Sequence, residues 1–183
     1  ILCTEELKAD INRAVFPGSQ GGPLMHIIAA KAVALKIAQS EEFKARQRQT
    51  IANARALAEG LIAGGVEVLT GGTDTHLVLV DLRPNDLDGK TGEARLDEIG
   101  ITVNFNTIPF DPNPPMNPSG LRIGTPALTT RGLVEDDMRE IAELICVALS
   151  DEFDSRKGEL ASRSRALMDR YPLYPHLRGA GVS

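Results

Sequence analysis

The chain has 183 residues, 42% of them apolar and 25% charged, so it can bury a hydrophobic core and is not disordered by composition. Its net charge of -5 gives no basic field that would attract nucleic acid or an anionic membrane, so we predict neither partner. Cys3 and Cys146 lie in apolar settings, and the three histidines have no metal-ligand spacing, which argues against a disulfide framework and a metal site. Because the sequence contains no evident membrane span or signal peptide, we predict a cytoplasmic protein with buried thiols.

The first predicted element is a helix that ends near Val15. Thr4 is a favoured helix cap, and Glu5 and Glu6 occupy the first turn, where the helix dipole stabilises acidic side chains. The three residues before it, ILC at residues 1–3, are typical of the end of a buried strand, and no methionine precedes them. We therefore expect the natural protein to begin upstream.

A glycine-rich stretch, FPGSQGGPLMH at residues 16–26, follows this helix. Gly18, Gly21 and Gly22 lack the Cβ atoms that would keep a ligand from the backbone, and Pro23 has a φ suited to the first turn of a helix. Such a helix N-terminus offers unpaired N–H groups to a phosphate or a carboxylate. A tight turn that merely requires glycine is the alternative, and this stretch alone leaves both open.

Two long helices are predicted next. Residues 24–38 are apolar almost all round, so this helix should be buried and should hold the glycine-rich stretch rigidly. Residues 41–63 are amphipathic, and Gly64-Gly65 ends the pattern. Because the spacing of apolar residues changes after these glycines, we predict that the second helix leads into another domain.

Short strands and helices alternate in the second half of the chain. We predict strands at residues 66–69, 76–82, 101–104 and 121–125, and helices at residues 93–99, 135–149 and 153–168. The strand at residues 76–82 alternates too little to have one face in water. The tail from Pro172 onward is predicted to fray.

Residues 106–120 are irregular, because five of these fifteen residues are proline, which excludes both a helix and a central strand. A structured loop over a binding site and an interdomain linker both fit this composition.

Two other local patterns carry no functional prediction. GKT at residues 89–91 resembles part of a phosphate-binding P-loop, but Pro84 stands where that motif needs a glycine, so we interpret Lys90 as a solvated surface lysine. Asp81 and Asp111 are too isolated in the sequence to argue for a catalytic carboxylate pair.

Arg122 is the strongest candidate for a ligand-binding side chain. In a strand, Leu121 and Ile123 face one way while Arg122 and Gly124 face the other, so the guanidinium emerges beside a residue without a side chain. If the guanidinium lies on the interior side of a small strand, its paired N–H groups are suited to bind a carboxylate in a bidentate geometry. An internal ion pair with one of the 25 acidic residues is the alternative.

Four motifs together resemble the serine hydroxymethyltransferase family. They are FPGSQGGPLMH at residues 16–26, TGGTDTH at residues 70–76, TVNFN at residues 102–106 and SGLRIGTPA at residues 119–127. Four motifs in the right order are far more specific than one glycine-rich loop, and the resemblance covers nearly the whole chain. It implies that the chain is the C-terminal part, under half, of a family member.

The resemblance also implies a fold and a reaction. The expected fold is α/β, the C-terminal part of an aspartate-aminotransferase-type (fold type I) pyridoxal-phosphate enzyme. Residues 1–40 would end the large cofactor-binding domain, residues 41–65 would be the connecting helix, and residues 66–183 would form the small C-terminal α/β domain. The implied reaction interconverts serine plus tetrahydrofolate with glycine plus 5,10-methylenetetrahydrofolate, using pyridoxal 5'-phosphate. The implied partner is the second subunit of a homodimer, or the missing N-terminal part.

Individual positions take their expected roles from the same resemblance. Gly22, with its neighbour Gly21, resembles the glycine that meets the cofactor phosphate of the partner subunit, and Arg122 resembles the arginine that binds the amino-acid carboxylate. The implied folate-contacting residues are Asn106, Pro114, Pro115 and Met116. No catalytic residue is expected in this part, because the Schiff-base lysine would lie upstream.

One departure from the family pattern concerns folate. Bacterial members commonly have Ser-Pro-Phe where this chain has Pro114-Pro115-Met116, so aromatic packing is lost there while backbone contacts can remain. This departure bears on folate affinity and not on reaction type. The alternative to a truncated enzyme is a separately encoded, non-catalytic module that binds folate or phosphate or has a regulatory role.

Overall fold

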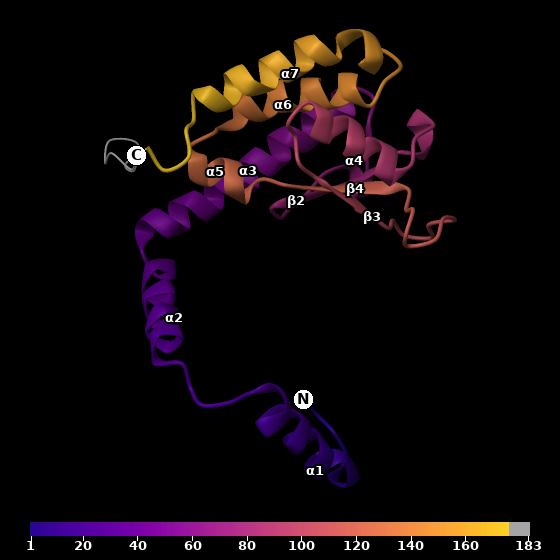
Figure 1. The fold of residues 1–183 in the computed structure, drawn as a ribbon. Coiled ribbons are helices and arrows are strands. Elements are labelled where there is room, and N and C mark those ends of the chain that lie inside the picture. The colour runs from indigo at the N-terminus through magenta and orange to yellow at the C-terminus, as the bar shows by residue number, and fades with distance from the viewer. Residues whose placement is uncertain (176–183) are drawn as a thin grey trace, which may run out of the picture. The chain divides into compact units, whose positions relative to one another are not determined.

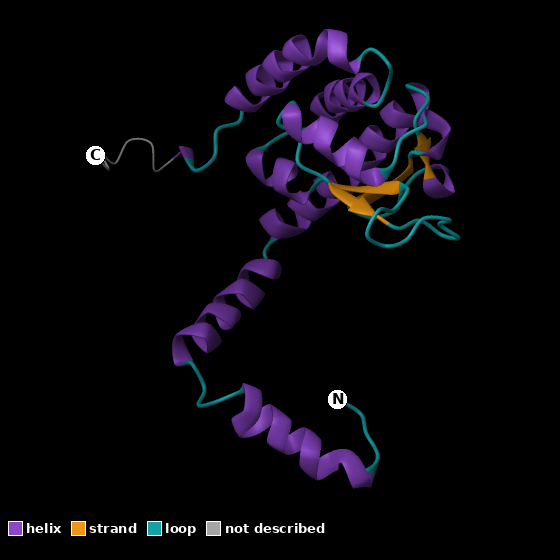
Figure 2. Cartoon of the chain, turned by 45° about the vertical axis from the view of Figure 1, so that its right-hand side comes forward, coloured by secondary structure: helices purple, strands orange, loops and turns teal. Residues whose placement is uncertain are grey.

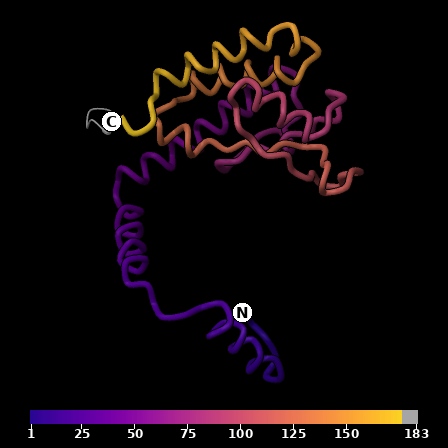
Figure 3. Tube along the Cα trace, viewed as in Figure 1, coloured from indigo at the N-terminus to yellow at the C-terminus, as the bar shows by residue number. Residues whose placement is uncertain are grey.

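The structure is a computed structural model that describes residues 1–175 (Figure 1). The chain divides into two compact units, residues 1–44 and residues 45–183, and the Cα trace in Figure 3 follows both in chain order. The predicted tail beyond residue 175, including His176, lies outside the described residues. The assignment of residues 1–40, 41–65 and 66–183 to parts of a larger enzyme stays a prediction.

The first unit contains two helices with a turn between them. Helix α1 (Glu5–Arg13) begins after Thr4 as predicted, although the Thr4 side chain makes no capping hydrogen bond. The helical conformation continues through Ala14 and stops before Phe16, whose backbone is extended (φ -133°, ψ 123°), so the predicted end near Val15 is confirmed. The strand expected at residues 1–3 is wrong, because these residues are exposed and belong to no strand.

Helix α2 (Met25–Ala38) differs from its prediction in burial. None of its residues is buried, although only a few of them are polar. An apolar surface all round a helix needs neighbours all round, and the described residues of the first unit do not supply them. The helix also begins at Met25 after the N-cap Leu24, so Pro23 precedes the cap and is not in the first turn.

The second unit is built on a small antiparallel sheet (Figure 2). Its four strands are β1 (Glu67–Val68), β2 (Leu77–Asp81), β3 (Asn104–Asn106) and β4 (Gly120–Gly124). They are ordered β1-β2-β4-β3, and each neighbouring pair is antiparallel. β4 is therefore a central strand, hydrogen-bonded to β2 on one side and to β3 on the other.

Helices pack on one face of this sheet (Figure 1). The helices of this unit, in chain order, are α3 (Glu41–Ala63, which begins in the first unit), α4 (Gly89–Glu98), α5 (Pro126–Arg131), α6 (Glu135–Ala148) and α7 (Phe153–Asp169). Val78 and Val80 of β2 and Leu121 of β4 enter one core with apolar side chains of α3, α4, α6 and α7. The predicted helix at residues 41–63 is confirmed, and the last two helices agree with prediction to within one residue.

The opposite face of the sheet is open within the described part of the second unit. Leu77 is exposed and Leu79 is half-exposed, whereas Val78 and Val80 are buried. The expectation that both faces of this strand are covered is therefore wrong. Continuous apolar sequence predicted burial on both sides, but the helices cover one side only.

Three elements of the second unit were misjudged from sequence. α4 begins at Gly89 instead of residue 93, because the Asp88 carboxylate accepts a hydrogen bond from Thr91 N (2.8 Å) and caps the helix. The third strand lies at Asn104–Asn106 and not at residues 101–104. The short helix α5, between Pro126 and Gly132, was not predicted at all.

The cysteines and the long helices allow two further comparisons. Cys3 is exposed, against prediction, whereas Cys146 is half-buried, and burial raises its pKa to about 11. No helix among residues 1–175 is long and apolar enough to cross a membrane, and the same residues contain no cluster of side chains suited to a metal ion.

Candidate functional site

The open face of the sheet carries Arg122 at its centre. Arg122 lies opposite Leu79 of β2 on one side and opposite Asn104 of β3 on the other. Leu121 and Ile123 are buried while Arg122 and Gly124 are exposed, so the predicted alternation along the strand is confirmed. The expectation that Arg122 lies on an interior side is wrong for this chain, because Arg122 is exposed and no described residue of the second unit covers that face.

Arg122 has only a weak partner. Its Nη2 lies 3.5 Å from Asn104 Oδ1, which is the long limit of a hydrogen bond. Within residues 1–175 it forms no ion pair with an acidic side chain, so the internal ion pair considered from sequence is absent there. The arginine therefore presents an uncompensated positive charge on the open face, where it can bind an anion.

Asn106 stands on the same face of β3 as Asn104, since residues two apart in a strand point the same way. It pairs with Gly120, two residues before Arg122 in β4. Its Nδ2 donates to the carbonyl of Thr107 (2.7 Å) at the start of the proline-rich loop, residues 107–119. The register thus brings Asn106 and Arg122, which are 16 positions apart in sequence, to neighbouring rows of one sheet surface.

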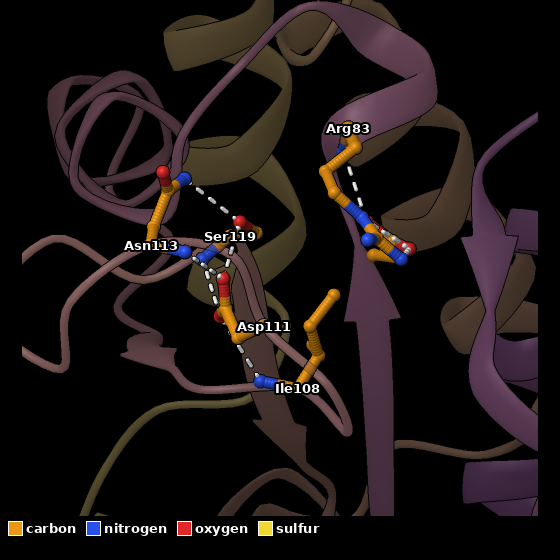
Figure 4. A network of polar contacts seen from close by, with 6 residues as sticks. Arg83, Ile108, Asp111, Asn113 and Ser119 are labelled. Atoms are coloured by element: carbon orange, nitrogen blue, oxygen red, sulfur yellow. Dashed lines mark hydrogen bonds and ion pairs between the residues drawn. The ribbon is translucent and has the colours of Figure 1, made fainter.

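The proline-rich loop joins β3 to β4 within one sheet, so it is not an interdomain linker. Its centre is the carboxylate of Asp111, which accepts four hydrogen bonds (Figure 4). The donors are Ser119 N (2.9 Å), Ser119 Oγ (2.7 Å), Asn113 N (3.0 Å) and Ile108 N (3.2 Å). These donors, Ser119 N above all, hold the pKa of Asp111 well below its usual range.

The loop is also tied to helix α4. Gly89 N donates to the Pro118 carbonyl (2.7 Å), and Asn117 Nδ2 donates to Asp88 Oδ2 (3.3 Å). Because Gly89 N and Thr91 N are both occupied in this way, two of the three amides of the GKT sequence are not available to a phosphate. This agrees with our rejection of a P-loop, and Lys90 is exposed as predicted.

The predicted folate-contacting run lies at the surface of this loop. Pro114, Pro115 and Met116 are all exposed, Met116 to 73%. The Pro114 carbonyl accepts a hydrogen bond from Asn117 N (2.8 Å), which closes a turn around the run. The run is therefore held in a defined conformation while its side chains face outward.

A second acidic residue near this loop is structural. Asp81 is buried at the end of β2, and its carboxylate takes both Nε (3.0 Å) and Nη2 (2.6 Å) of Arg83. The paired guanidinium lowers the pKa of Asp81, whereas burial and, to a smaller extent, the nearby charge of Asp111 oppose this effect. Both carboxylates are saturated with donors, so neither is placed to act as a general acid or base.

The glycine-rich stretch of the first unit borders a shallow depression of about 490 Å³. Gly21 and Gly22 line it together with Ser19, Gln20 and the first turns of α2, and Lys31 also borders it. A Cβ built on Gly21 or Gly22 would meet nothing within 4 Å. Neither glycine has a positive φ.

These two observations bear on the tight-turn interpretation. A turn needs glycine for a positive φ or for close packing, and within the described residues Gly21 and Gly22 show neither. Gly18 is different, because its Cβ would lie 2.9 Å from the Arg13 carbonyl oxygen. Gly18 is thus required by the chain's own packing, whereas Gly21 and Gly22 leave room for something outside it.

Sequence reasoning missed three participants in these sites. Asn104 contacts Arg122, and the alternation Asn-Phe-Asn in a strand was a signal that two amides share one face. Asp111 organises the loop, and an aspartate followed by proline is typical of a side-chain-capped turn. Lys31 borders the depression together with Leu24, Ile27 and Ile28, and the spacing of these residues at three, four and seven positions was a signal that they share one face of the helix.

Comparison with known proteins gives a consistent result. The sequence model of the serine hydroxymethyltransferase family matches residues 2–145. The chain is similar to the serine hydroxymethyltransferases of Kineococcus radiotolerans, with 57% identity over 180 residues, and of Kocuria rhizophila, with 58% identity over 182 residues. These matches cover 96% and 97% of this chain but only 41% and 42% of the two relatives, so the chain spans about two fifths of their length.

Proposed function

Because the chain belongs to the serine hydroxymethyltransferase family, we propose that it is the C-terminal portion of an enzyme that interconverts serine plus tetrahydrofolate with glycine plus 5,10-methylenetetrahydrofolate. The reaction uses pyridoxal 5'-phosphate, and the enzyme acts as a cytoplasmic homodimer. The portion alone is inactive in this proposal, because the lysine that carries the cofactor belongs to the upstream part.

The observation that carries the proposal is the state of Arg122. An arginine on a central strand, with one long contact to Asn104 and no acidic partner among residues 1–175, retains its capacity for a planar, bidentate bond to a carboxylate. Serine and glycine share their α-carboxylate, so one arginine can orient both substrate and product. We assign this role to Arg122.

The glycine-rich stretch fits the phosphate of the cofactor. Gly21 and Gly22 leave free space where any other residue would place a Cβ, and the N-terminus of α2 adds a partial positive charge. Lys31 on the edge of the same depression adds a full positive charge. In the proposed dimer these groups hold the phosphate of the partner subunit.

The cofactor, when bound, supplies an electron sink for the bond changes at the amino acid. The residues of this chain supply binding and orientation: Arg122 fixes the carboxylate, and Gly21 and Gly22 admit the phosphate. Neither Asp81 nor Asp111 moves a proton in this scheme, because each carboxylate is saturated with hydrogen bonds from its own neighbours.

The proline-rich loop is assigned to tetrahydrofolate. Asn106 and the run Pro114-Pro115-Met116 would contact it, and the hydrogen bonds to Asp111 hold the loop in shape before the ligand arrives. A preformed loop lowers the entropic cost of binding. The exposure of Met116 supports an outward-facing contact.

The experiment that tests this function uses the full-length protein encoded by the gene. With pyridoxal 5'-phosphate bound, it should convert serine to glycine in a reaction that depends on tetrahydrofolate. Absence of tetrahydrofolate-dependent glycine formation would refute the proposal. The intact mass of the natural protein, compared with the mass that its encoding DNA predicts, distinguishes two cases. In one the chain is part of this enzyme, and in the other it is an independent binding module.

A further inference from the structure

Phe110 stands out in the proline-rich loop because its side chain is fully exposed. Its relative exposure is 100%, whereas that of Ile108, two residues earlier, is only 5%. Its backbone has a φ of +56°, in the left-handed region. A phenylalanine in this conformation is unusual, because glycine and asparagine are the residues that tolerate it.

The turn that holds Phe110 is well defined. Asp111 N donates to the Ile108 carbonyl (3.1 Å), and Ile108 N donates back to Asp111 Oδ2 (3.2 Å). Pro109 and Phe110 therefore occupy the two central positions of a four-residue turn, the second of which has the positive φ. This is the arrangement in which proline is favoured first and glycine or asparagine second.

Phe110 thus combines two features that destabilise the fold, a positive φ and an exposed aromatic ring. A left-handed conformation costs a non-glycine residue about 1–2 kcal/mol, and an exposed aromatic ring forgoes the stabilisation that burial would give. Nothing in the described residues covers the ring in return. Strain retained at a residue that serves no internal contact is a sign of an external one.

The position of the loop indicates what that contact is. The loop leaves β3 at Asn106 and enters β4 at Gly120, two residues before Arg122, so it begins and ends at the edge of the sheet next to the row that carries Arg122. Met116 is the second large apolar side chain that this loop exposes. An aromatic ring and a thioether on one rigid loop suit a flat, conjugated ligand ring, through stacking and sulfur contacts.

We propose that Phe110 is a specificity-determining residue that packs its ring against a conjugated ring of the folate co-substrate. This inference rests on the function proposed above and assigns the aromatic contact of the loop to a residue outside the Pro114-Pro115-Met116 run. The ring contacted is either the pterin or the aminobenzoyl group, which present the same kind of π-face.

The test uses the full-length holoenzyme and isothermal titration with tetrahydrofolate in the presence of glycine. Phe110→Asn removes the ring and places a residue that tolerates positive φ, so the fold should be kept. Its Kd for tetrahydrofolate should rise about fivefold or more, since aromatic pairs contribute beyond their buried area. Phe110→Tyr should stay near the wild-type value, and Phe110→Leu, which keeps an apolar side chain without a ring, should resemble Phe110→Asn.

Asp86→Asn is the matched control. Asp86 is an exposed non-glycine residue with a φ of +53° that lies outside the loop, so the same new residue there should leave the Kd unchanged. A tetrahydropterin without the aminobenzoyl group identifies the ring: a loss of affinity for both ligands assigns the pterin, and a loss for tetrahydrofolate alone assigns the aminobenzoyl group.

The inference is overturned if wild type and Phe110→Asn bind tetrahydrofolate equally well. It is also overturned if the variant changes only the melting temperature or the oligomeric state, because Phe110 is then a subunit or interdomain contact. Failure of the wild-type holoenzyme to bind tetrahydrofolate at all is a different result, which refutes the proposed function itself.

Discussion

Arg122 of β4 and Asn104 of β3 face each other across the sheet, with 3.5 Å between Arg122 Nη2 and Asn104 Oδ1. The contact is long enough to orient the guanidinium without neutralising it. An arginine held in this way is available to an incoming carboxylate, and this relationship leads to the first prediction.

Arg122→Ala in the full-length enzyme should weaken glycine and serine binding by about 1.5 to 3 kcal/mol, because the charge-assisted, bidentate hydrogen bonds to the carboxylate are lost. Arg122→Lys should weaken binding nearly as much, since an ammonium group cannot form two parallel hydrogen bonds to a carboxylate as a planar guanidinium does. Spectral titration of the bound cofactor with glycine measures both effects. Arg165→Ala, at an exposed arginine of α7, is the control and should bind normally. Normal affinity in either Arg122 variant would mean that Arg122 is structural.

Gly22→Val should weaken cofactor retention about tenfold or more in the full-length enzyme and should also loosen the dimer. The physical reason is that the added side chain occupies space that this chain leaves empty around Gly22. Dialysis followed by absorbance gives the cofactor occupancy, and sedimentation gives the dimer. An unchanged cofactor occupancy together with an unchanged dimer would show that Gly22 is not part of the phosphate site.

Asp111→Ala should loosen the proline-rich loop and lower the melting temperature by about 3–6 °C, because the Ser119 N–H and hydroxyl lose their acceptor. The effect should depend on pH in a defined direction. The folded-state pKa of Asp111 lies below its ordinary value of about 3.9, so its stabilisation is complete above that value and is lost as the pH falls below it. The difference between wild type and variant should therefore be largest near neutral pH and should shrink on acidification below about pH 4. A difference in melting temperature that stays constant from pH 7 to about pH 3 would contradict this assignment.

Gly89→Ala should lower the free energy of unfolding by about 2 kcal/mol or more. Its Cβ would lie 2.6 Å from the Gly120 carbonyl oxygen and 2.9 Å from that of Pro118, and both are backbone atoms that cannot easily move. Gly158→Ala is the matched control within α7, where a Cβ meets nothing within 4 Å. This control should raise stability by about 0.5–1 kcal/mol through helix propensity. Chemical unfolding measures both, and equal effects would show that α4 does not pack tightly on the loop.

The 183-residue chain by itself, mixed with pyridoxal 5'-phosphate and borohydride, should be labelled only substoichiometrically and at scattered positions. All six of its lysines are exposed, so none has the enclosed environment that a reactive amine requires. The peptide map should report the labelled fraction at Lys31 in particular, because Lys31 lies beside the glycine-rich stretch. Stoichiometric labelling at one lysine would show that the chain holds a complete cofactor site and is not part of an enzyme.

Local sequence was sufficient for most of the helices and for the alternation around Arg122. The helix at residues 41–63 and the last two helices follow from apolar periodicity, which acts over neighbouring residues only. The same reasoning failed at α4 and α5, where small and polar residues make a weak pattern and where the Asp88 cap or Gly132 defines the ends. The glycine-rich stretch was recognised from sequence. The sequence did not show that Gly18 is required by packing, whereas Gly21 and Gly22 have free space around them.

What the sequence by itself determined is the family, the presence of both helices and strands, and the identity of Arg122 as a candidate, because these depend on residue types and their order. Only the tertiary structure decided that the helices cover one face of the sheet, which leaves Leu79 half-exposed and Arg122 exposed on the other. It also decided that Asp111 closes the proline-rich loop through donors up to eight positions away, and that Phe110 is held outward. These features depend on which segments meet in space, and residues that are distant in sequence give no local signal of such a meeting.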